Sequence, residues 1–138
     1  MYICWAKINW IYFHKYRVKK RRFIYNYYRK NLSFIPFISF VDDIEDFYSN
    51  RWLTTILISN KSEINREDLR LELLKNNIES RPLWKPMHLQ PVFNSYDSFN
   101  NGISEDLFDR GLCLPSGSNM DEKDLQRVVN VIKGLYEN

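Results

Sequence analysis

Three prolines, Pro82, Pro86 and Pro91, fall within twelve residues and exclude regular structure from that part of the chain. Proline fixes φ and donates no backbone hydrogen bond, so residues 80–91 can form neither a helix interior nor a central strand. The same segment carries large or cationic side chains: Arg81, Trp84, Lys85, Met87 and His88. A rigid, irregular segment of this composition between two regular elements is typical of a binding loop.

The length of 138 residues suits one small domain, and a hydrophobic content of 44% is enough for a packed core. The charge is divided unevenly along the chain. Residues 1–32 hold nine of the 20 Lys and Arg residues and none of the 17 acids. This asymmetry occurs in nucleic-acid-binding arms, and also in helices that dock on an acidic surface or on another domain.

The two cysteines, Cys4 and Cys113, lack the spacing of metal ligands, and a disulfide framework is not expected. A reducing compartment suits such a chain. Residues 3–13 are apolar and aromatic but contain Lys7 and Asn9, so they are too short and too polar to span a bilayer. They also lack the cleavage site of a signal peptide. We therefore expect a cytoplasmic protein with no membrane segment.

Residues 6–31 contain neither glycine nor proline, and they predict one long basic helix that stops near Leu32. Its apolar stripe consists of Ile8, Ile11, Tyr12, Tyr16, Phe23 and Tyr27. A short strand is expected over 37–41, followed by an acidic loop over 42–50. Residues 52–58 are dense in β-branched side chains and predict the best strand of the chain.

A second helix is predicted over 66–75, with Asn65 as N-cap and Asp68 three residues on. Ile64 and Leu69 occupy the positions of a hydrophobic staple. Its core residues are expected to be Leu69, Leu73 and Leu74. Asn76 and Asn77 offer a left-handed stop, and residues 78–81 follow as a short strand.

Ser104 is expected to cap a short helix that Gly111 ends at positive φ. Residues 112–114 predict a buried strand. Asp121 with Asp124 caps a last helix over 122–135, whose core face would be Leu125, Val128, Val129, Ile132 and Leu135. Together these patterns predict an α+β fold with three or four short strands and three main helices.

His88 is a candidate for ligand contact, although its setting also fits a histidine satisfied by ordinary hydrogen bonds. No other ligand lies at metal spacing, so no metal site is expected. Lys85 could act as an amine nucleophile if burial or nearby cations lowered its pKa, and otherwise it is an exposed cation. Arg81 could hold a carboxylate or phosphate in a bidentate contact, or form an ordinary surface ion pair.

The basic run at residues 19–22 is flanked by aromatic residues. It could bind nucleic acid through phosphate charge and base stacking. The alternative is the solvated face of an amphipathic helix whose aromatic residues pack inward.

The segment SRPLWKPMHLQP at 80–91 and the segment SEDLFDRGLCLPSGS at 104–118 are two long, specific motifs. They resemble the C-terminal domain of the DegT/DnrJ/StrS family, the pyridoxal-phosphate (PLP) sugar aminotransferases. Shorter matches, RVKKRR at 17–22 and SNRW at 49–52, extend the resemblance over roughly residues 16–136.

The resemblance implies the small C-terminal domain of a fold-type I PLP-dependent transferase, with 1–32 as a basic linking helix and 33–138 as the small domain. It implies a homodimeric enzyme of polysaccharide biosynthesis that moves an amino group from glutamate to a nucleotide-linked keto sugar, using PLP. The family's loop lies near the nucleotide sugar. The implied substrate-binding residues are therefore His88, foremost, with Trp84, Lys85 and Arg81.

The resemblance does not extend to the family's cofactor-binding half. We therefore expect no catalytic residue, no bound PLP and no turnover by this chain alone, as in a gene remnant. Residues 1–15 depart from the family's pattern and could be unrelated sequence. Two other classes stay open: a small basic nucleic-acid-binding protein using residues 7–30, and a non-catalytic accessory subunit that pairs with a separately encoded large domain.

The aromatic stripe of the first helix has nothing in the sequence to cover it. Several exposed aromatic side chains together favour association, because burying each is worth on the order of 2 kcal/mol. We therefore expect self-association rather than specific nucleic-acid binding. The residues expected to drive it are Trp10, Tyr12, Phe13, Phe23 and Tyr27.

Overall fold

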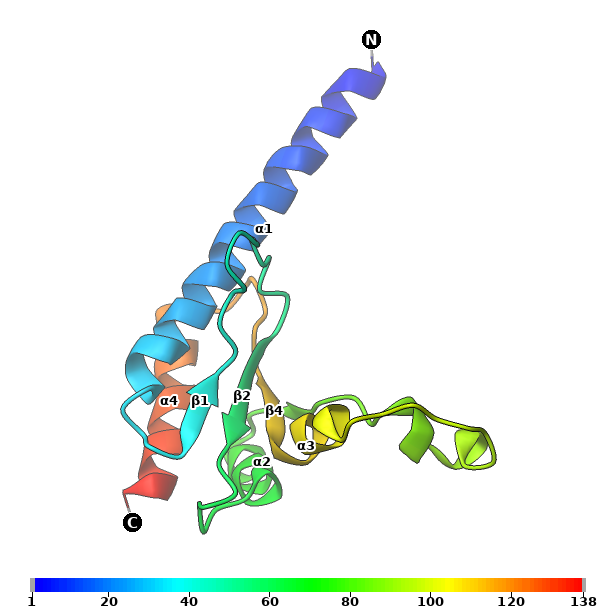
Figure 1. Ribbon diagram of the computed structural model, residues 1–138. Coiled ribbons are helices and arrows are strands. Elements are labelled where there is room, and N and C mark those ends of the chain that lie inside the picture. The colour runs from blue at the N-terminus through cyan, green and yellow to red at the C-terminus, as the bar shows by residue number, and fades with distance from the viewer. Residues whose placement is uncertain (1, 138) are drawn as a thin grey trace.

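The computed structural model describes residues 2–137, and the side chains of residues 12–137. Within this range the chain forms four α-helices, two 3₁₀ turns and one four-stranded sheet (Figure 1), so the predicted α+β class is confirmed. In chain order the elements are α1 (Tyr2–Leu32), β1 (Ile38–Phe40), β2 (Thr54–Ile58), α2 (Arg66–Lys75), β3 (Arg81–Pro82), η1 (Met87–Leu89), η2 (Pro91–Phe93), α3 (Ile103–Arg110), β4 (Gly111–Leu114) and α4 (Glu122–Tyr136).

The sheet has the strand order β1-β2-β4-β3, and every neighbouring pair is antiparallel. Ile56 on β2 lies opposite Leu112 on β4, and both are fully buried in a core shared with α1, α2 and α4. Because side chains alternate along a strand, the next pair, Thr55 and Cys113, projects from the opposite face. Their Oγ1 and Sγ atoms are 3.6 Å apart. The sheet therefore has a helix-covered face and a second face that leads toward the proline segment.

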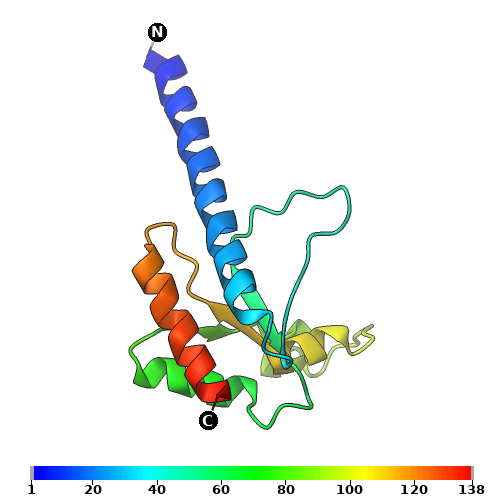
Figure 2. The same ribbon diagram turned by 90° about the vertical axis from the view of Figure 1, so that its left-hand side faces the viewer.

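Helix α1 is longer than predicted, because it already begins at Tyr2, and it ends at Leu32 as predicted. Only its C-terminal half packs on the body, through Ile24, Tyr28 and Leu32, which are fully buried. These three residues are spaced by four, so they share one face of the helix. The N-terminal half rises beyond the rest of the fold (Figures 1 and 2). Although α1 has 31 residues, no helix within residues 2–137 offers an apolar stretch long enough to cross a bilayer.

The expected exposure of the aromatic stripe on α1 is confirmed for Tyr12, Phe13 and Phe23, which are 70%, 53% and 40% exposed. The alternative prediction, that these aromatic residues pack inward, is therefore wrong. Tyr27 is the exception, since it is half-buried and its hydroxyl donates to Oε1 of Gln126 at 2.6 Å. The side chains of Ile8, Trp10 and Ile11 lie outside the described ones.

The predicted start of α2 is confirmed. Asn65 Oδ1 accepts from the backbone N–H of Glu67 and Asp68, and the Asp68 carboxylate accepts from the Asn65 N–H at 2.9 Å. Asn77 adopts φ +54° after the helix, as predicted. Leu74 was wrongly assigned to the core: it is exposed, because one residue of helix turns it about 100° away from buried Leu73.

The last helix also follows its predicted signals. Asp121 and Asp124 form a reciprocal capping box at the start of α4. The helix ends one residue later than predicted, at Tyr136. Four of the five predicted core residues are buried and Leu135 is partly buried against them.

Two predictions around α3 are wrong. The N-cap is Gly102, at φ +77°, and not Ser104. Gly111 does not end the helix at positive φ, because its φ is −87° and it is the first residue of β4. Its need for glycine is steric. A Cβ there would lie 2.2 Å from Cδ1 of Leu83 and 2.5 Å from the carbonyl oxygen of Leu107.

The strands are shorter than predicted at their ends. The strand expected over 37–41 is confined to β1, and the one expected over 52–58 begins only at Thr54. The strand expected over 78–81 reduces to β3, where Arg81 pairs with Cys113. Ile78 belongs instead to the buried core.

Candidate functional site

The proline segment leaves the sheet at β3 and is fixed at its start by one backbone bond, from the Leu83 N–H to the Gly111 carbonyl at 3.3 Å. Leu83 then lies directly over Gly111, where a side chain would collide with it. Beyond this point the chain forms η1 and η2 and runs outward from the body (Figure 1). The proline segment is therefore attached to the sheet where α3 leads into β4.

His88, in η1, has a definite partner. Its Nε2 lies 2.5 Å from Oε1 of Glu105 on α3, and both side chains are partly buried. A carboxylate at Nε2 fixes the ring orientation and leaves Nδ1 for a second contact. The neighbouring Arg110–Asp106 ion pair braces α3, and its hydrogen bond lowers the pKa of Asp106. Glu105 had no signal in the sequence, because it is 17 residues from His88.

Trp84 stacks on a second tryptophan that was not among the predicted site residues. Its ring centroid lies 6.0 Å from that of Trp52, with 27° between the planes. The two indoles are 67% and 59% exposed, so their outer faces are open to solvent. Trp52 is 32 positions earlier in the chain, just before β2, and its N–H donates to Asn50 Oδ1. Two open indoles side by side form a surface on which a planar ring can stack.

A pocket of about 370 Å³ opens beside this pair. Its lining includes Trp52, Ser80, Arg81, Trp84, Cys113 and Ser116. Arg81 forms an ion pair with Glu79 at 2.6 Å, and both side chains are largely exposed. An exposed pair of this kind is weak, so the guanidinium can exchange its carboxylate for an incoming anion.

The structure does not bring the four predicted site residues together in one place. Trp84 and Arg81 line the pocket, whereas His88 lies farther along the loop against Glu105. Lys85 is exposed and is not part of the pocket lining. No lysine is present among the residues that line this pocket, so they do not fit PLP, which requires a lysine amine for its Schiff base. Among the described side chains, those of residues 12–137, no group of three or more His, Cys, Asp or Glu could hold a metal ion.

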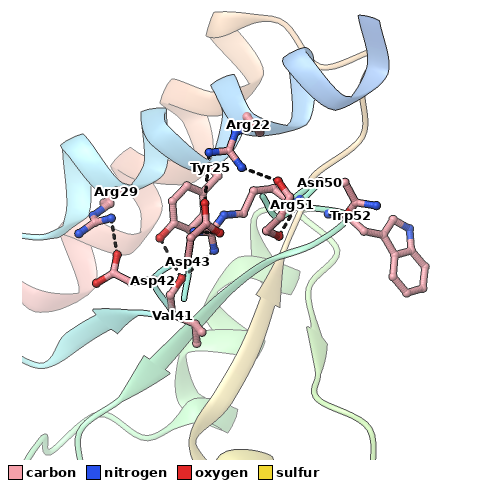
Figure 3. Close-up of polar contacts among 10 residues, drawn as sticks. Arg22, Tyr25, Arg29, Val41, Asp42, Asp43, Asn50, Arg51 and Trp52 are labelled. Atoms are coloured by element: carbon pink, nitrogen blue, oxygen red, sulfur yellow. Dashed lines mark hydrogen bonds and ion pairs between the residues drawn. The ribbon is translucent and has the colours of Figure 1, made fainter. Parts of the chain in front are cut away.

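Trp52 owes its position to a polar cluster between α1 and the acidic loop (Figure 3). The Arg51 guanidinium forms an ion pair with Asp43 at 2.7 Å and donates to the Val41 carbonyl at 2.7 Å. On α1, Arg22 also contacts Asp43, at 3.2 Å, and the Tyr25 hydroxyl donates to the Val41 carbonyl. These contacts fix both ends of the loop against the helix and hold the backbone that carries Trp52.

The sequence profile of the DegT/DnrJ/EryC1/StrS aminotransferase family matches residues 14–133. The chain belongs to this family. The resemblance carried by the two long motifs is therefore confirmed, and residues 1–13 lie outside the match.

Among its relatives in this family is EpsN of Bacillus subtilis (strain 168), provisionally named as a pyridoxal phosphate-dependent aminotransferase. It is 43% identical over 124 residues, which cover 87% of this chain and 31% of EpsN. The GDP-perosamine synthase of Vibrio cholerae is 29% identical over 120 residues, covering 86% of this chain and 32% of that enzyme. The chain thus spans about a third of the length of these relatives.

Solved structures give the same fold. PseC of Helicobacter pylori, an aminotransferase involved in the biosynthesis of pseudoaminic acid, superposes with a TM-score of 0.76 at 17% identity, over 87% of this chain and 33% of PseC. DesV of S. venezuelae superposes with a TM-score of 0.77 at 20% identity, over 88% of this chain and 32% of DesV. The predicted small domain of a PLP-dependent transferase is confirmed as the fold of this chain.

Proposed function

We propose that this chain forms the substrate-facing part of an aminotransferase that moves an amino group from glutamate to a nucleotide-linked keto sugar. Family membership supports the aminotransferase class. The name of the Vibrio cholerae relative, a GDP-perosamine synthase, supports a nucleotide-linked sugar as the substrate class.

The observation that carries the proposal is the open tryptophan pair beside an exchangeable arginine. Stacking on an indole suits any nucleobase, because every base has a π-face. In this arrangement Trp52 and Trp84 bind the base and Arg81 binds the diphosphate in place of Glu79. The ligand would thus occupy the pocket at β3 with its flat ring against the open indoles.

His88 is proposed to contact the sugar end of the same ligand. Glu105 holds its Nε2, so Nδ1 is the atom left to bond a hydroxyl or carbonyl group. PLP supplies the electron sink in enzymes of this class, but the pocket residues of this chain do not fit it. We propose that residues 1–138 bind the nucleotide sugar without turning it over, and that turnover and homodimerisation belong to a longer family member.

Ligand-detected NMR tests the binding half of this proposal. With a GDP-linked hexose and, separately, a UDP-linked hexose, saturation transfer should reach the base protons. Trp84→Ala and Arg81→Ala should each weaken binding by about tenfold. Lys123→Glu, at an exposed position on α4, is the control and should bind as the wild type does. Equal transfer in Trp84→Ala and wild type would overturn the assignment of the pocket.

Absorption spectroscopy with added PLP tests the other half. We expect no internal-aldimine band, and borohydride should attach no cofactor to the chain. Stoichiometric labelling of Lys85 would show that the loop lysine is catalytic, and it would overturn the proposal that this chain does not turn over substrate.

A further inference from the structure

The segment that returns from η2 to α3 contains a dipeptide whose own groups can react with each other. Asn101 is the only asparagine in the sequence that glycine follows. The backbone nitrogen of the next residue can attack the side-chain amide of an asparagine, and glycine has no side chain to shield that nitrogen. Because both groups belong to neighbouring residues, the reaction depends on the local backbone and needs neither a partner nor a cofactor.

The structure leaves the attacking nitrogen free. Residues 97–101 form neither helix nor strand. Within the described part of the chain, the Gly102 N–H has no hydrogen-bond acceptor. Gly102 has φ +77°, a left-handed conformation that glycine adopts without steric cost. No backbone bond therefore holds the Gly102 nitrogen away from the neighbouring amide.

The side-chain carbonyl of Asn101 already has a hydrogen-bond donor. Its Oδ1 accepts from the Ile103 N–H at 3.3 Å. Attack at Cγ moves negative charge onto this oxygen, and a donor placed there stabilises the charge as it develops. The turn before α3 thus supplies the nucleophile, the carbon that it attacks and a donor for the developing charge.

Asn50 provides an internal comparison. Its Oδ1 accepts from the Trp52 N–H at 3.1 Å, and the residue between them, Arg51, is also left-handed, at φ +49°. The two turns are therefore alike except for the side chain of the second residue. At position 51 that side chain stands beside the attacking nitrogen, and Asp43 holds its guanidinium. We therefore expect Asn101 to react much faster than Asn50.

We propose that Asn101 is a site of spontaneous deamidation, and that the product loosens the contact between Glu105 and His88. The Gly102 nitrogen forms a bond to Cγ of Asn101 and gives its proton to solvent. The Cγ–Nδ2 bond breaks, and Nδ2 takes up a proton and leaves as ammonia. Water then opens the cyclic imide at either carbonyl, which yields aspartate or isoaspartate. Nothing is oxidised or reduced, and water is the only co-reactant.

The product acts on His88 through α3. A Cβ built on Gly102 would lie 3.6 Å from Oε2 of Glu105, so this carboxylate lies next to the altered backbone. The other carboxylate oxygen, Oε1, lies 2.5 Å from Nε2 of His88. Isoaspartate lengthens the backbone by a carbon just before Gly102, and its new negative charge repels the Glu105 carboxylate. The His88 ring should therefore lose its fixed orientation as the product accumulates.

Peptide mapping by mass spectrometry, with enzymatic labelling of isoaspartate, tests the first part of the proposal. The chain is incubated in mildly alkaline buffer, because loss of the proton on the backbone nitrogen speeds the attack. Residue 101 should gain the mass that replaces NH₂ by OH, and its peptide should become labelled. Asn101→Ser removes the amide but keeps an oxygen that can accept from Ile103, so its peptide should stay unlabelled. Asn100→Ser is the matched control and should react as the wild type does.

Gly102→Asn tests the role of the glycine. Asparagine tolerates the left-handed conformation, and a Cβ there would meet only Oε2 of Glu105, its chain neighbours apart, so the fold should be kept. Deamidation of Asn101 should slow at least about tenfold, because a side chain then shields the nitrogen. The new asparagine precedes β-branched Ile103, which shields it in turn.

NMR of the histidine rings in the incubated, ligand-free chain tests the second part. A second set of His88 signals should grow in proportion to the isoaspartate content. The signals of His14, on α1, should stay unchanged and serve as the reference. Asn101→Ser, incubated in the same way, should keep a single set of His88 signals.

Three results would overturn the proposal. The first is an Asn101 that stays intact in the folded chain. The second is deamidation of Asn50 as fast as that of Asn101, which would mean that the glycine is not decisive. The third is an unchanged set of His88 signals in a chain whose residue 101 has been converted to isoaspartate.

Discussion

The guanidinium of Arg51 lies over the ring of Tyr25, 3.7 Å from its centroid. The stacking joins the residue that precedes Trp52 to the middle of α1, and Asp43 closes the same cluster. Arg51 has φ +49°, a conformation that is costly for a residue with a Cβ. The cluster therefore holds the backbone in a conformation that aims the next side chain, Trp52, at Trp84.

Replacing Arg51 by alanine should lower the free energy of unfolding by about 1–3 kcal/mol, because the nearly buried guanidinium loses its contacts with Asp43 and the Val41 carbonyl. Asp43 then keeps only Arg22 as a donor, and the Val41 carbonyl keeps only the Tyr25 hydroxyl. Urea denaturation measures the change. Arg81→Ala is the control: its side chain is exposed, so the change should stay within about 0.5 kcal/mol. A loss for Arg51→Ala as small as for the control would show that the cluster does not stabilise the fold.

Leu73→Ala and Val129→Ala should each cost roughly 2–4 kcal/mol, because both side chains are fully buried and their removal leaves a cavity. Thermal and urea unfolding provide the comparison. Leu74→Ala on the same helix removes an exposed side chain and should cost less than about 1 kcal/mol. Similar losses at 73 and 74 would contradict the orientation of α2.

Replacing Gly111 by alanine should destabilise the fold, whereas replacing Gly134 by alanine should stabilise it. At Gly111 the new methyl group would collide with Leu83 and with the Leu107 carbonyl, so we expect a loss of about 1–3 kcal/mol. At Gly134, in α4, the added carbon would meet no heavy atom within 4 Å apart from its chain neighbours and the adjacent backbone of the helix itself, so alanine should stabilise the helix by up to about 1 kcal/mol. A neutral Gly111→Ala would mean that Leu83 moves aside freely.

Tyr28 should make the fold sensitive to alkaline pH. Burial, with a smaller contribution from Asp124, raises the pKa of its hydroxyl well above the ordinary value of 10.0. The folded state therefore binds this proton more tightly than the unfolded state. Its stabilising contribution is complete below about pH 10 and is lost as the pH rises further.

Urea denaturation between neutral pH and pH 11 tests this assignment. Tyr28→Phe should lose some stability at neutral pH, because the bond to the Pro115 carbonyl is gone, but its stability should fall less steeply above pH 10. Tyr12→Phe, at an exposed position, should keep the wild-type slope. Parallel curves for wild type and Tyr28→Phe would assign the alkaline loss to other groups.

The helix starts could be predicted from the sequence because their signals are local. Asn65 with Asp68, and Asp121 with Asp124, satisfy each other's backbone within four residues, so no distant contact is needed to recognise them. The two long motifs were likewise sufficient to place the chain in its family, since motif recognition requires only residue order.

Only the tertiary structure decided which groups meet across long stretches of chain. Glu105 is 17 residues from His88, and Trp52 is 32 from Trp84, so no spacing rule connects them. The steric need for glycine at position 111 could not be predicted from the sequence either, because Leu83, 28 residues earlier, causes it.

Helix α1 shows both what the sequence determined and what only the tertiary structure decided. By itself the sequence determined a long basic helix with an aromatic stripe, because periodicity is a property of local spacing. It did not determine that Ile24, Tyr28 and Leu32 would be the covered face and Tyr12, Tyr16 and Phe23 the open one. Both faces are apolar, and burial depends on where β1, β4 and α4 come to lie. That placement follows from long-range packing, which hydrophobic spacing along one helix does not encode.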